Sequence, residues 1–155
     1  MDGNWKKLLL CLAIPLGVGA LASLLSGGMA LYEQVAQPPL SPPGWVFPVV
    51  WTILYLLMGY ASYMVWCAAG RTAPGRRALA LYGGQLAVNF LWPLLFFRWQ
   101  LFGLAFACLV VLWVLIFLTM RAFSRIRARA GDLLVPYLLW VTFAGYLNYG
   151  VFVLN

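Results

Sequence analysis

Residues 99–120 read WQLFGLAFACLVVLWVLIFLTM, a long stretch with no charged side chain. A helix needs about 20 predominantly apolar residues to cross the hydrocarbon core of a bilayer, which is about 30 Å thick. Four further stretches share this length and composition, so the predicted spans are residues 8–26, 45–69, 78–97, 99–120 and 133–154. The sequence therefore predicts an all-α integral membrane protein, a bundle of five transmembrane helices.

The composition supports this fold class and limits where function can reside. Hydrophobic residues make up 65% of the chain and charged residues 8%, whereas soluble domains contain roughly 25% charged residues. The five spans use almost the whole chain and leave no room for a soluble catalytic domain. Whatever the protein does must therefore take place inside the bundle or at its rim.

The charged residues indicate the orientation in the membrane. One side of the predicted bundle receives most of the basic residues, namely Lys6, Lys7, Arg71, Arg76, Arg77, Arg121, Arg125, Arg127 and Arg129. The other side receives only Arg98, together with Glu33. The positive-inside rule then predicts a cytoplasmic N-terminus and an external Asn155. The net charge of +7 is thus a topology signal, and nucleic-acid binding is not indicated.

The first span has an alternative interpretation. Lys6 and Lys7 before an apolar run, with small residues near Ala22, resemble a cleaved signal peptide. The run is longer than the usual apolar region of about 7–15 residues in such peptides, and it contains Pro15 and Gly19. These features favour a packed membrane helix.

The polar residues exclude several classes of chemistry. Histidine is absent, and the carboxylates are Asp2, Glu33 and Asp132, so no catalytic triad, acid pair or zinc ligand set is possible. The three cysteines, Cys11, Cys67 and Cys108, are too scattered to indicate a disulfide framework or a metal site. We therefore expect no required cofactor. Asp132 is expected to cap the start of the last span. Proton-coupled export is disfavoured because the spans hold no ionisable residue away from their ends.

The connection between the first two spans, residues 27–44, is the longest loop. It contains Pro38, Pro39, Pro42 and Pro43, and proline fixes φ and lacks a backbone N–H. We expect this segment not to be helical and to form a stiff cover. Two interpretations remain open: a plain connector, or a lid over the outer end of the bundle.

Helical spacing places polar, aromatic or small residues on one face of four of the five spans. These stripes are Trp51, Tyr55, Met58 and Ser62; Gln85, Asn89, Trp92 and Phe96; Tyr137, Trp140, Ala144 and Asn148; and the small residues Pro15, Gly19, Ser23 and Ser26. An amide facing lipid would leave unsatisfied polar groups, so the stripes should point inward. They predict either a ligand cavity or polar contacts that join the helices.

Three motifs in order resemble the TspO/MBR family, the tryptophan-rich sensory proteins related to the translocator protein, or peripheral benzodiazepine receptor. They are PPGWVF at 42–47, LYGGQLAVNFLWP at 81–93 and PYLLW at 136–140. The resemblance covers the whole chain and implies a single transmembrane domain, residues 1–155, with five helices around a ligand cavity. It also implies a homodimer.

The resemblance further implies the ligands and the residues that hold them. Members of the family bind porphyrins, haem-type tetrapyrroles, sterols and benzodiazepine-like ligands. Carried over by motif, the ligand-binding residues are Tyr32, Pro42, Trp51, Asn89, Phe90, Trp140 and Ala144. A porphyrin is a flat aromatic plate with acidic edges, which suits indole faces and an amide donor. Without histidine, metal-free protoporphyrin or weakly ligated haem is favoured.

The sequence thus favours a porphyrin-binding membrane receptor or transporter-like protein with a sensory or regulatory role in tetrapyrrole or stress responses. Its expected partners are membrane lipid, porphyrin-type small molecules and a second copy of the chain. Two alternatives are kept. One is an enzyme that degrades porphyrin in light, with Trp51 and Trp140 as candidate catalytic residues. The other is a scaffold that regulates partner membrane proteins without a ligand. The expected location is the cytoplasmic membrane of a bacterium.

Overall fold

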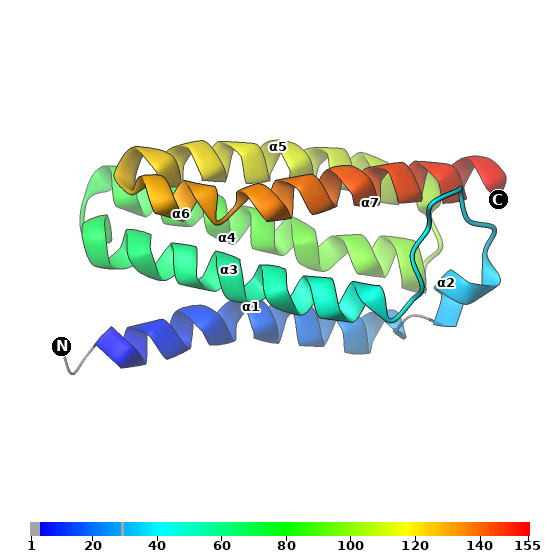
Figure 1. Cartoon of the computed structure of the whole chain (residues 1–155), viewed down its shortest axis with the longest axis horizontal. Helices are drawn as coiled ribbons and strands as arrows, with labels where there is room; N and C mark the ends of the chain where they lie inside the picture. The colour runs from blue at the N-terminus through cyan, green and yellow to red at the C-terminus, as the bar shows by residue number, and fades with distance from the viewer. Residues whose placement is uncertain (1–3, 29) are drawn as a thin grey trace.

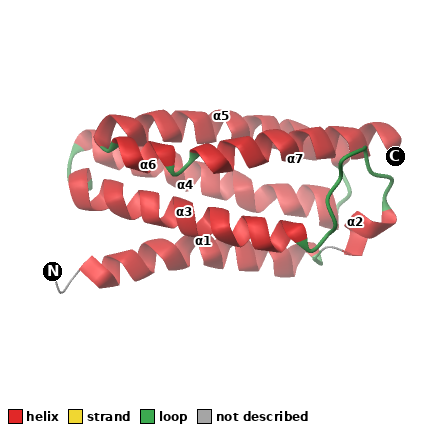
Figure 2. Ribbon diagram, in the orientation of Figure 1, coloured by secondary structure: helices red, strands yellow, loops and turns green. Residues whose placement is uncertain are grey.

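A computed structural model describes residues 4–28 and 30–155 of the chain as a bundle of helices that run along its long axis (Figure 1). The described ends of the chain lie at opposite ends of the bundle. The long helices are α1 (Asn4–Ser26), α3 (Val46–Ala69), α4 (Ala73–Pro93), α5 (Phe102–Ile126) and α7 (Val135–Leu154). Short helices α2 (Ala30–Gln34) and α6 (Ala128–Asp132) lie in the connections, and the described residues form only helices and loops (Figure 2).

The prediction of five membrane spans is confirmed. The described part of the chain contains five helices that are long and apolar enough to cross a membrane, with α4 extended by the following turn and α7 by α6. The protein is therefore an integral membrane protein with a helical bundle. The apolar side chains on its outside, such as Leu24 at 79% exposure and Leu139 at 64%, are those that a bilayer would solvate.

Three helices extend further into their basic ends than predicted. α1 begins at Asn4 and so includes Lys6 and Lys7, ahead of the predicted start at residue 8. α4 begins at Ala73, where Thr72 accepts a hydrogen bond from the Gly75 N–H at 3.1 Å and so satisfies one free donor of the first turn. α5 continues to Ile126, beyond the predicted end at residue 120. Basic residues such as Arg125 in its last turn interact favourably with the partial negative charge of a helix C-terminus. Charge therefore marks the end of the apolar region and not the end of the helix.

The last turn of α4 is widened. Pro93 is followed by a π-helical turn, η1 (Leu94–Arg98), in which the Trp99 N–H donates to the Leu94 carbonyl at 3.0 Å. Proline removes a backbone donor and crowds the preceding turn, which disrupts regular α-helical bonding. π-Turns inside helices are rare and frequent at functional sites. This turn brings Phe97 to the end of the bundle at which the site described below is found.

Two local predictions were wrong. Asp132 does not cap the last span: it ends α6, and the residue before α7 is Leu134, which makes no side-chain capping bond. The connection 27–44 is not free of helix, because α2 forms one turn before the first proline, Pro38. Proline restricts the residues near it, but five non-proline residues upstream are enough for a single helical turn.

The inward-facing stripes are largely confirmed. Their buried members are Tyr55, Met58 and Ser62 on α3, Gln85, Asn89 and Trp92 on α4, Phe96 in the following turn η1, and Tyr137, Ala144 and Asn148 on α7. α3 packs against α1 and α4, and α5 packs against α4 and α7. Helices α1 and α3 approach closely at Gly59, where an added Cβ would lie 2.6 Å from the Cys11 carbonyl oxygen. Small residues permit this approach where lipid gives no hydrophobic drive for association.

Candidate functional site

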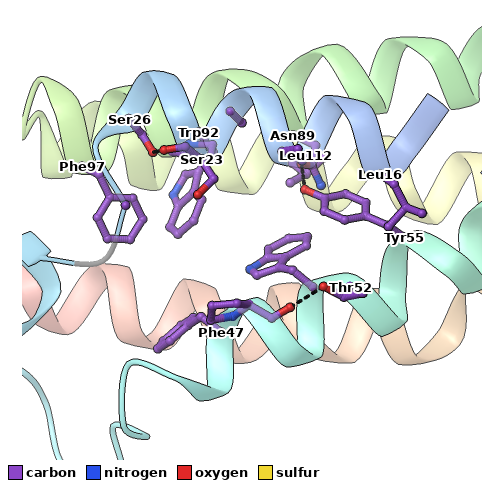
Figure 3. A pocket seen from close by; sticks show the side chains of 17 residues that line it. Leu16, Ser23, Ser26, Phe47, Thr52, Tyr55, Asn89, Trp92, Phe97 and Leu112 are labelled. Carbon is purple, nitrogen blue, oxygen red and sulfur yellow. Dashed lines mark hydrogen bonds between the residues drawn. The ribbon is translucent and has the colours of Figure 1, made fainter. Parts of the chain in front are cut away.

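A cavity of about 340 Å³ lies between α1, α3 and α4 (Figure 3). Its volume falls in the range of small-molecule sites. Aromatic rings form much of its wall, namely Phe47, Trp51, Tyr55, Trp92 and Phe97. None of the described residues that line it is charged. Such a site favours flat, apolar ligands.

Small side chains of α1 make room for this cavity. Gly19, Ala22, Ser23 and Ser26 line it from that side. Gly19 has a second role, because a side chain there would collide with the Tyr55 ring. The glycine therefore allows the phenol to lie directly against α1 at one end of the cavity, near Leu16, as Figure 3 shows.

A chain of hydrogen bonds forms the polar end of the cavity. The Tyr55 hydroxyl donates to Asn89 Oδ1 at 2.9 Å, and Asn89 Nδ2 donates to the Tyr137 hydroxyl oxygen at 2.7 Å. The Tyr137 hydroxyl in turn donates to Gln85 Oε1 at 2.6 Å. Tyr55 and Asn89 line the cavity, whereas Tyr137 and Gln85 lie behind them in the core. The chain joins α3, α4 and α7 and holds the Asn89 side chain in place at the cavity wall.

Trp92 is held in the cavity wall by the two helices behind it. Its indole N–H donates to Asn148 Oδ1 at 2.9 Å, and Asn148 Nδ2 donates to the Phe102 carbonyl at 2.9 Å. One face of the indole is therefore left to the cavity, and Phe97 meets the ring edge-on with centroids 5.9 Å apart. This wall is built before any ligand arrives, which lowers the ordering cost of binding.

The connection between α1 and α3 is folded back on itself by Tyr32, and we use the name lid segment for its residues 30–44. The Tyr32 hydroxyl donates to the Pro42 carbonyl at 2.7 Å, and Gln37 Nε2 donates to the Tyr32 carbonyl. The Tyr32 ring packs edge-on against Phe47 with centroids 4.8 Å apart. Burial raises the pKa of the Tyr32 phenol, which keeps its hydroxyl a donor. Because Phe47 also lines the cavity, Tyr32 supports the cavity wall from the lid side.

The lid segment is also fastened to α7. Asn155 pairs with the backbone of Ala36 in both directions: its Oδ1 accepts from the Ala36 N–H at 3.2 Å, and its Nδ2 donates to the Ala36 carbonyl at 2.9 Å. The Tyr146 hydroxyl donates to the Pro39 carbonyl at 2.7 Å. Pro38 sits against Gly150, where any side chain would collide with the proline ring. We call Asn155, Tyr146 and Gly150 the lid clasp.

Two of the seven predicted ligand-binding residues line the cavity, and the other five lie outside its lining. Trp51 and Asn89 line the cavity. Tyr32 and Pro42 meet each other in the lid segment, outside its lining. The remaining three, which also lie outside the lining, are Phe90, which is half-buried, Ala144, which is packed in the core, and Trp140.

Trp140 contacts Phe47 but does not line the cavity. Its ring packs edge-on against Phe47 with centroids 5.6 Å apart, and it lines a separate, open groove of about 420 Å³ between α3 and α7, with Val50 and Phe143 among its neighbours. Its buried indole N–H has no hydrogen-bond partner among the described residues. Trp51 and Trp140 therefore do not face one shared space.

Several cavity residues were not predicted as site residues. Phe47 and Phe97 are aromatic residues at the ends of spans, where belt aromatics are common, and Leu112 reaches the cavity from α5. The stripe of small residues on the first span did contain a signal, since Gly19, Ser23 and Ser26 all line the cavity. Within residues 4–28 and 30–155, no group of three or more His, Cys, Asp or Glu side chains could hold a metal ion.

Comparison with known proteins places this bundle among characterised relatives. The model of the TspO/MBR family matches residues 11–154. The tryptophan-rich protein TspO of Chlorobaculum tepidum is 39% identical over all of this chain and 99% of that protein. The tryptophan-rich sensory protein of Cereibacter sphaeroides is 38% identical over all of this chain and 95% of its own. The translocator protein of Bos taurus is 40% identical over 79% of this chain and 73% of its own.

Proposed function

The chain belongs to the TspO/MBR family, and we propose that it is a membrane receptor that binds porphyrin-type tetrapyrroles and benzodiazepine-like ligands in the cavity between α1, α3 and α4. Its role is then sensory or regulatory, as the name of the Cereibacter sphaeroides relative suggests. Ligand occupancy is the signal, and the lid segment is the element that responds to it.

One observation carries this proposal: a preformed, uncharged cavity with aromatic walls inside a membrane bundle. Trp51 and Trp92 offer indole faces to a flat ring system, and aromatic contacts of this kind contribute about 0.5–1.5 kcal/mol beyond the burial of area. The hydroxyls of Ser23 and Ser26 and the Asn89 amide supply the few polar groups that orient a ligand.

Titration of the purified protein with protoporphyrin in mild detergent tests the proposal, with quenching of tryptophan fluorescence as the readout. Ser23→Phe places a ring in the cavity, whereas Leu24→Phe places the same ring on the neighbouring, 79% exposed position outside the lining. We expect Ser23→Phe to weaken binding at least about tenfold, equivalent to roughly 1.4 kcal/mol, and Leu24→Phe to leave it unchanged. Equal affinity of both variants would place the ligand elsewhere.

A second candidate function, light-dependent degradation of porphyrin, is favoured by the surroundings of Trp51. Its ring lies 5.6 Å from that of Tyr55, which also lines the cavity, and 6.0 Å from that of Tyr137, which lies behind the cavity wall, centroid to centroid, so two further oxidisable rings adjoin Trp51. The same titration under illumination separates the two functions, because a receptor leaves porphyrin absorbance constant. If no porphyrin binds in the dark or in light, the ligand-independent scaffold becomes the supported function.

A further inference from the structure

The hydrogen-bond chain behind the cavity has a direction. Its donors run from Tyr55 through Asn89 and Tyr137 to Gln85, so that each hydroxyl hydrogen points away from the cavity. In this arrangement Tyr55 lines the cavity but its only hydrogen is already donated to Asn89 Oδ1. A ligand that meets the Tyr55 oxygen would find an acceptor and no donor.

The far end of this chain is unsatisfied. Gln85 Nε2 and the Tyr82 hydroxyl are both buried, and neither has a hydrogen-bond partner among the described residues. Gln85 is 1% exposed and Tyr82 7%. A buried polar group without a partner typically costs about 1–3 kcal/mol. The two residues lie three positions apart on α4 and therefore on the same face of the helix.

The same heavy-atom positions permit the reverse direction. The oxygen and nitrogen of a side-chain amide exchange places when the amide turns over. With both amides turned, Gln85 Nε2 donates to Tyr137, Tyr137 donates to Asn89 Oδ1, and Asn89 Nδ2 donates to the Tyr55 oxygen. The chain keeps all three hydrogen bonds. Gln85 then presents an acceptor, in place of a donor, on the face of α4 that carries the Tyr82 hydroxyl.

Reversal has one consequence inside the cavity. Because Tyr55 now accepts from Asn89, its own hydroxyl hydrogen is released toward the space that the residue lines. A carbonyl or other uncharged acceptor on a ligand can take that hydrogen without the desolvation cost of burying a charge. Without such an acceptor, reversal leaves the Tyr55 hydroxyl hydrogen unpaired, and no new hydrogen bond to the ligand stabilises the reversed chain.

We propose that Tyr55 selects ligands that carry a hydrogen-bond acceptor at the end inserted into the cavity, and that reversal of the Tyr55–Asn89–Tyr137–Gln85 chain supplies the donor. The inference rests on the proposed ligand-binding function and deepens it. Tyr55 is the residue that touches the ligand, while Tyr137 and Gln85 act through it and are positioning residues. An acceptor on the ligand thereby changes the direction of the hydrogen bonds as far as Gln85 in the core of the bundle.

The test uses two uncharged porphyrins of similar size. Protoporphyrin dimethyl ester carries carbonyl acceptors at its edge, and etioporphyrin carries only alkyl groups there. We expect the full-length protein to bind the ester about tenfold more tightly, the effect of one net hydrogen bond. Tyr55→Phe should reduce this ratio to about one. Tyr149→Phe, a matched change at an exposed tyrosine outside the cavity, should keep it.

A second measurement follows the positioning residues directly. In protein labelled with ¹⁵N-glutamine, the side-chain amide signal of Gln85, assigned through Gln85→Glu, should shift when the ester binds and not when etioporphyrin binds. Tyr137→Phe interrupts the chain without touching the cavity lining, so it should abolish this shift. A merely structural role of Tyr137 would leave the ligand-specific shift in place.

The outcomes separate the two proposals. Binding of both porphyrins with a ratio of one in the parent overturns the role of Tyr55 and leaves the receptor function standing. A preference for the ester that survives Tyr55→Phe likewise overturns it. An absence of binding by either porphyrin removes the receptor function, and the selection inferred from it falls as well. A Gln85 signal that shifts equally with both ligands excludes reversal as the mechanism.

Discussion

Trp51 and Trp140 are both predicted ligand-binding residues, but they have different surroundings in the bundle. Trp51 lines the cavity with its ring 5.6 Å from that of Tyr55, whereas Trp140 contacts Phe47 and lines the groove between α3 and α7. Both indoles pack near Phe47, yet they line different spaces. At the scale of the residue, the roles of Trp51 and Trp140 toward porphyrin can therefore be tested separately.

Phenylalanine at either position should preserve most binding, because a ring face is still presented. We expect Trp51→Phe and Trp140→Phe to bind protoporphyrin within about tenfold of the parent, or roughly 1.4 kcal/mol. If the protein degrades porphyrin in light, an indole serves as electron donor that a benzene ring cannot replace. Trp51→Phe should then lose most of this activity, and Trp140→Phe less of it. Decay of porphyrin absorbance under constant light, at matched bound fraction, is the measurement.

Equal decay in the parent and both variants would exclude a photochemical role for either indole. Decay that depends on Trp140 and not on Trp51 would instead place the reacting porphyrin in the groove between α3 and α7. Trp113→Phe is the matched control, because Trp113 lies on the outer groove between α5 and α7. It should leave both binding and decay unchanged.

At the scale of the element, the contacts that fasten the lid segment to α7 are individually weak. The clasp joins it to α7 through Asn155, Tyr146 and Gly150, and each exposed hydrogen bond contributes about 0.5–1.5 kcal/mol at most. If the segment acts as a lid, we expect it to open and reclose as a loop does. We then expect the clasp to affect the rate of ligand exchange more than the equilibrium affinity.

We expect the double variant Asn155→Ala, Tyr146→Phe to release bound ligand about tenfold faster, because it removes the side-chain bonds to Ala36 and Pro39. Stopped-flow recovery of tryptophan fluorescence after displacement by excess competitor measures this rate. Tyr149→Phe on the same helix, outside the clasp, should keep the parent rate. Unchanged release from the double variant would show that the lid segment does not gate the cavity.

At the same scale, helix α4 carries an exposed face of small residues. Ala80, Gly83, Gly84 and Ala87 are all exposed, and nothing lies within 4 Å of a Cβ built on Gly83 or Gly84. This face therefore does not serve packing within the described chain. Small residues at this spacing permit close approach of a helix from a second molecule.

We predict a homodimer that uses this face of α4. Gly83→Leu or Ala87→Leu should lower the dimer fraction in mild detergent, because the larger side chain separates the two backbones. Gly17→Leu is the matched control, since Gly17 on α1 also has open space around it. Cross-linking and size-exclusion chromatography with light scattering report the dimer fraction. An unchanged dimer in both α4 variants would place the interface on another helix.

At the scale of the whole molecule, the two ends of the bundle differ in charge. Arg71 lies between α3 and α4, Arg76 and Arg77 lie near the start of α4, and the arginines from Arg121 to Arg129 lie in the end of α5 and in α6 or next to it. The lid segment and Asn155 lie at the opposite end (Figure 1). The positive-inside rule then predicts a cavity whose lid faces away from the cytoplasm.

Single-cysteine labelling in a background without Cys11, Cys67 and Cys108 tests this topology. A cysteine at position 155 should react with a membrane-impermeant maleimide in intact cells. A cysteine at Arg129, which is exposed at the other end, should react only after lysis. The reverse pattern would invert the bundle, and the lid would then face the cytoplasm.

The sequence by itself determined the number of membrane spans, the charge difference between the ends and the inward face of four of the five long helices. These properties are local, because a charge-free run of about 20 residues and a period of 3.6 residues act within one helix. The same reasoning placed Trp51 and Asn89 on inward faces, and the resemblance to the TspO/MBR family identified both as site residues; both line the cavity. It misplaced the helix ends and the Asp132 cap, since basic residues and short turns continue a helix beyond its apolar part.

Only the tertiary structure decided which inward faces meet. Helical periodicity gives the direction of a side chain on its own helix but not the neighbour that faces it. The cavity therefore lies between α1, α3 and α4 and leaves Trp140 and Ala144 outside its lining. The partners of Asn89, from α3 and α7, and the clasp between Asn155 and Ala36, 119 positions apart, depend on the order of helices around the bundle. That order is set by packing between segments distant in sequence, which no single span encodes.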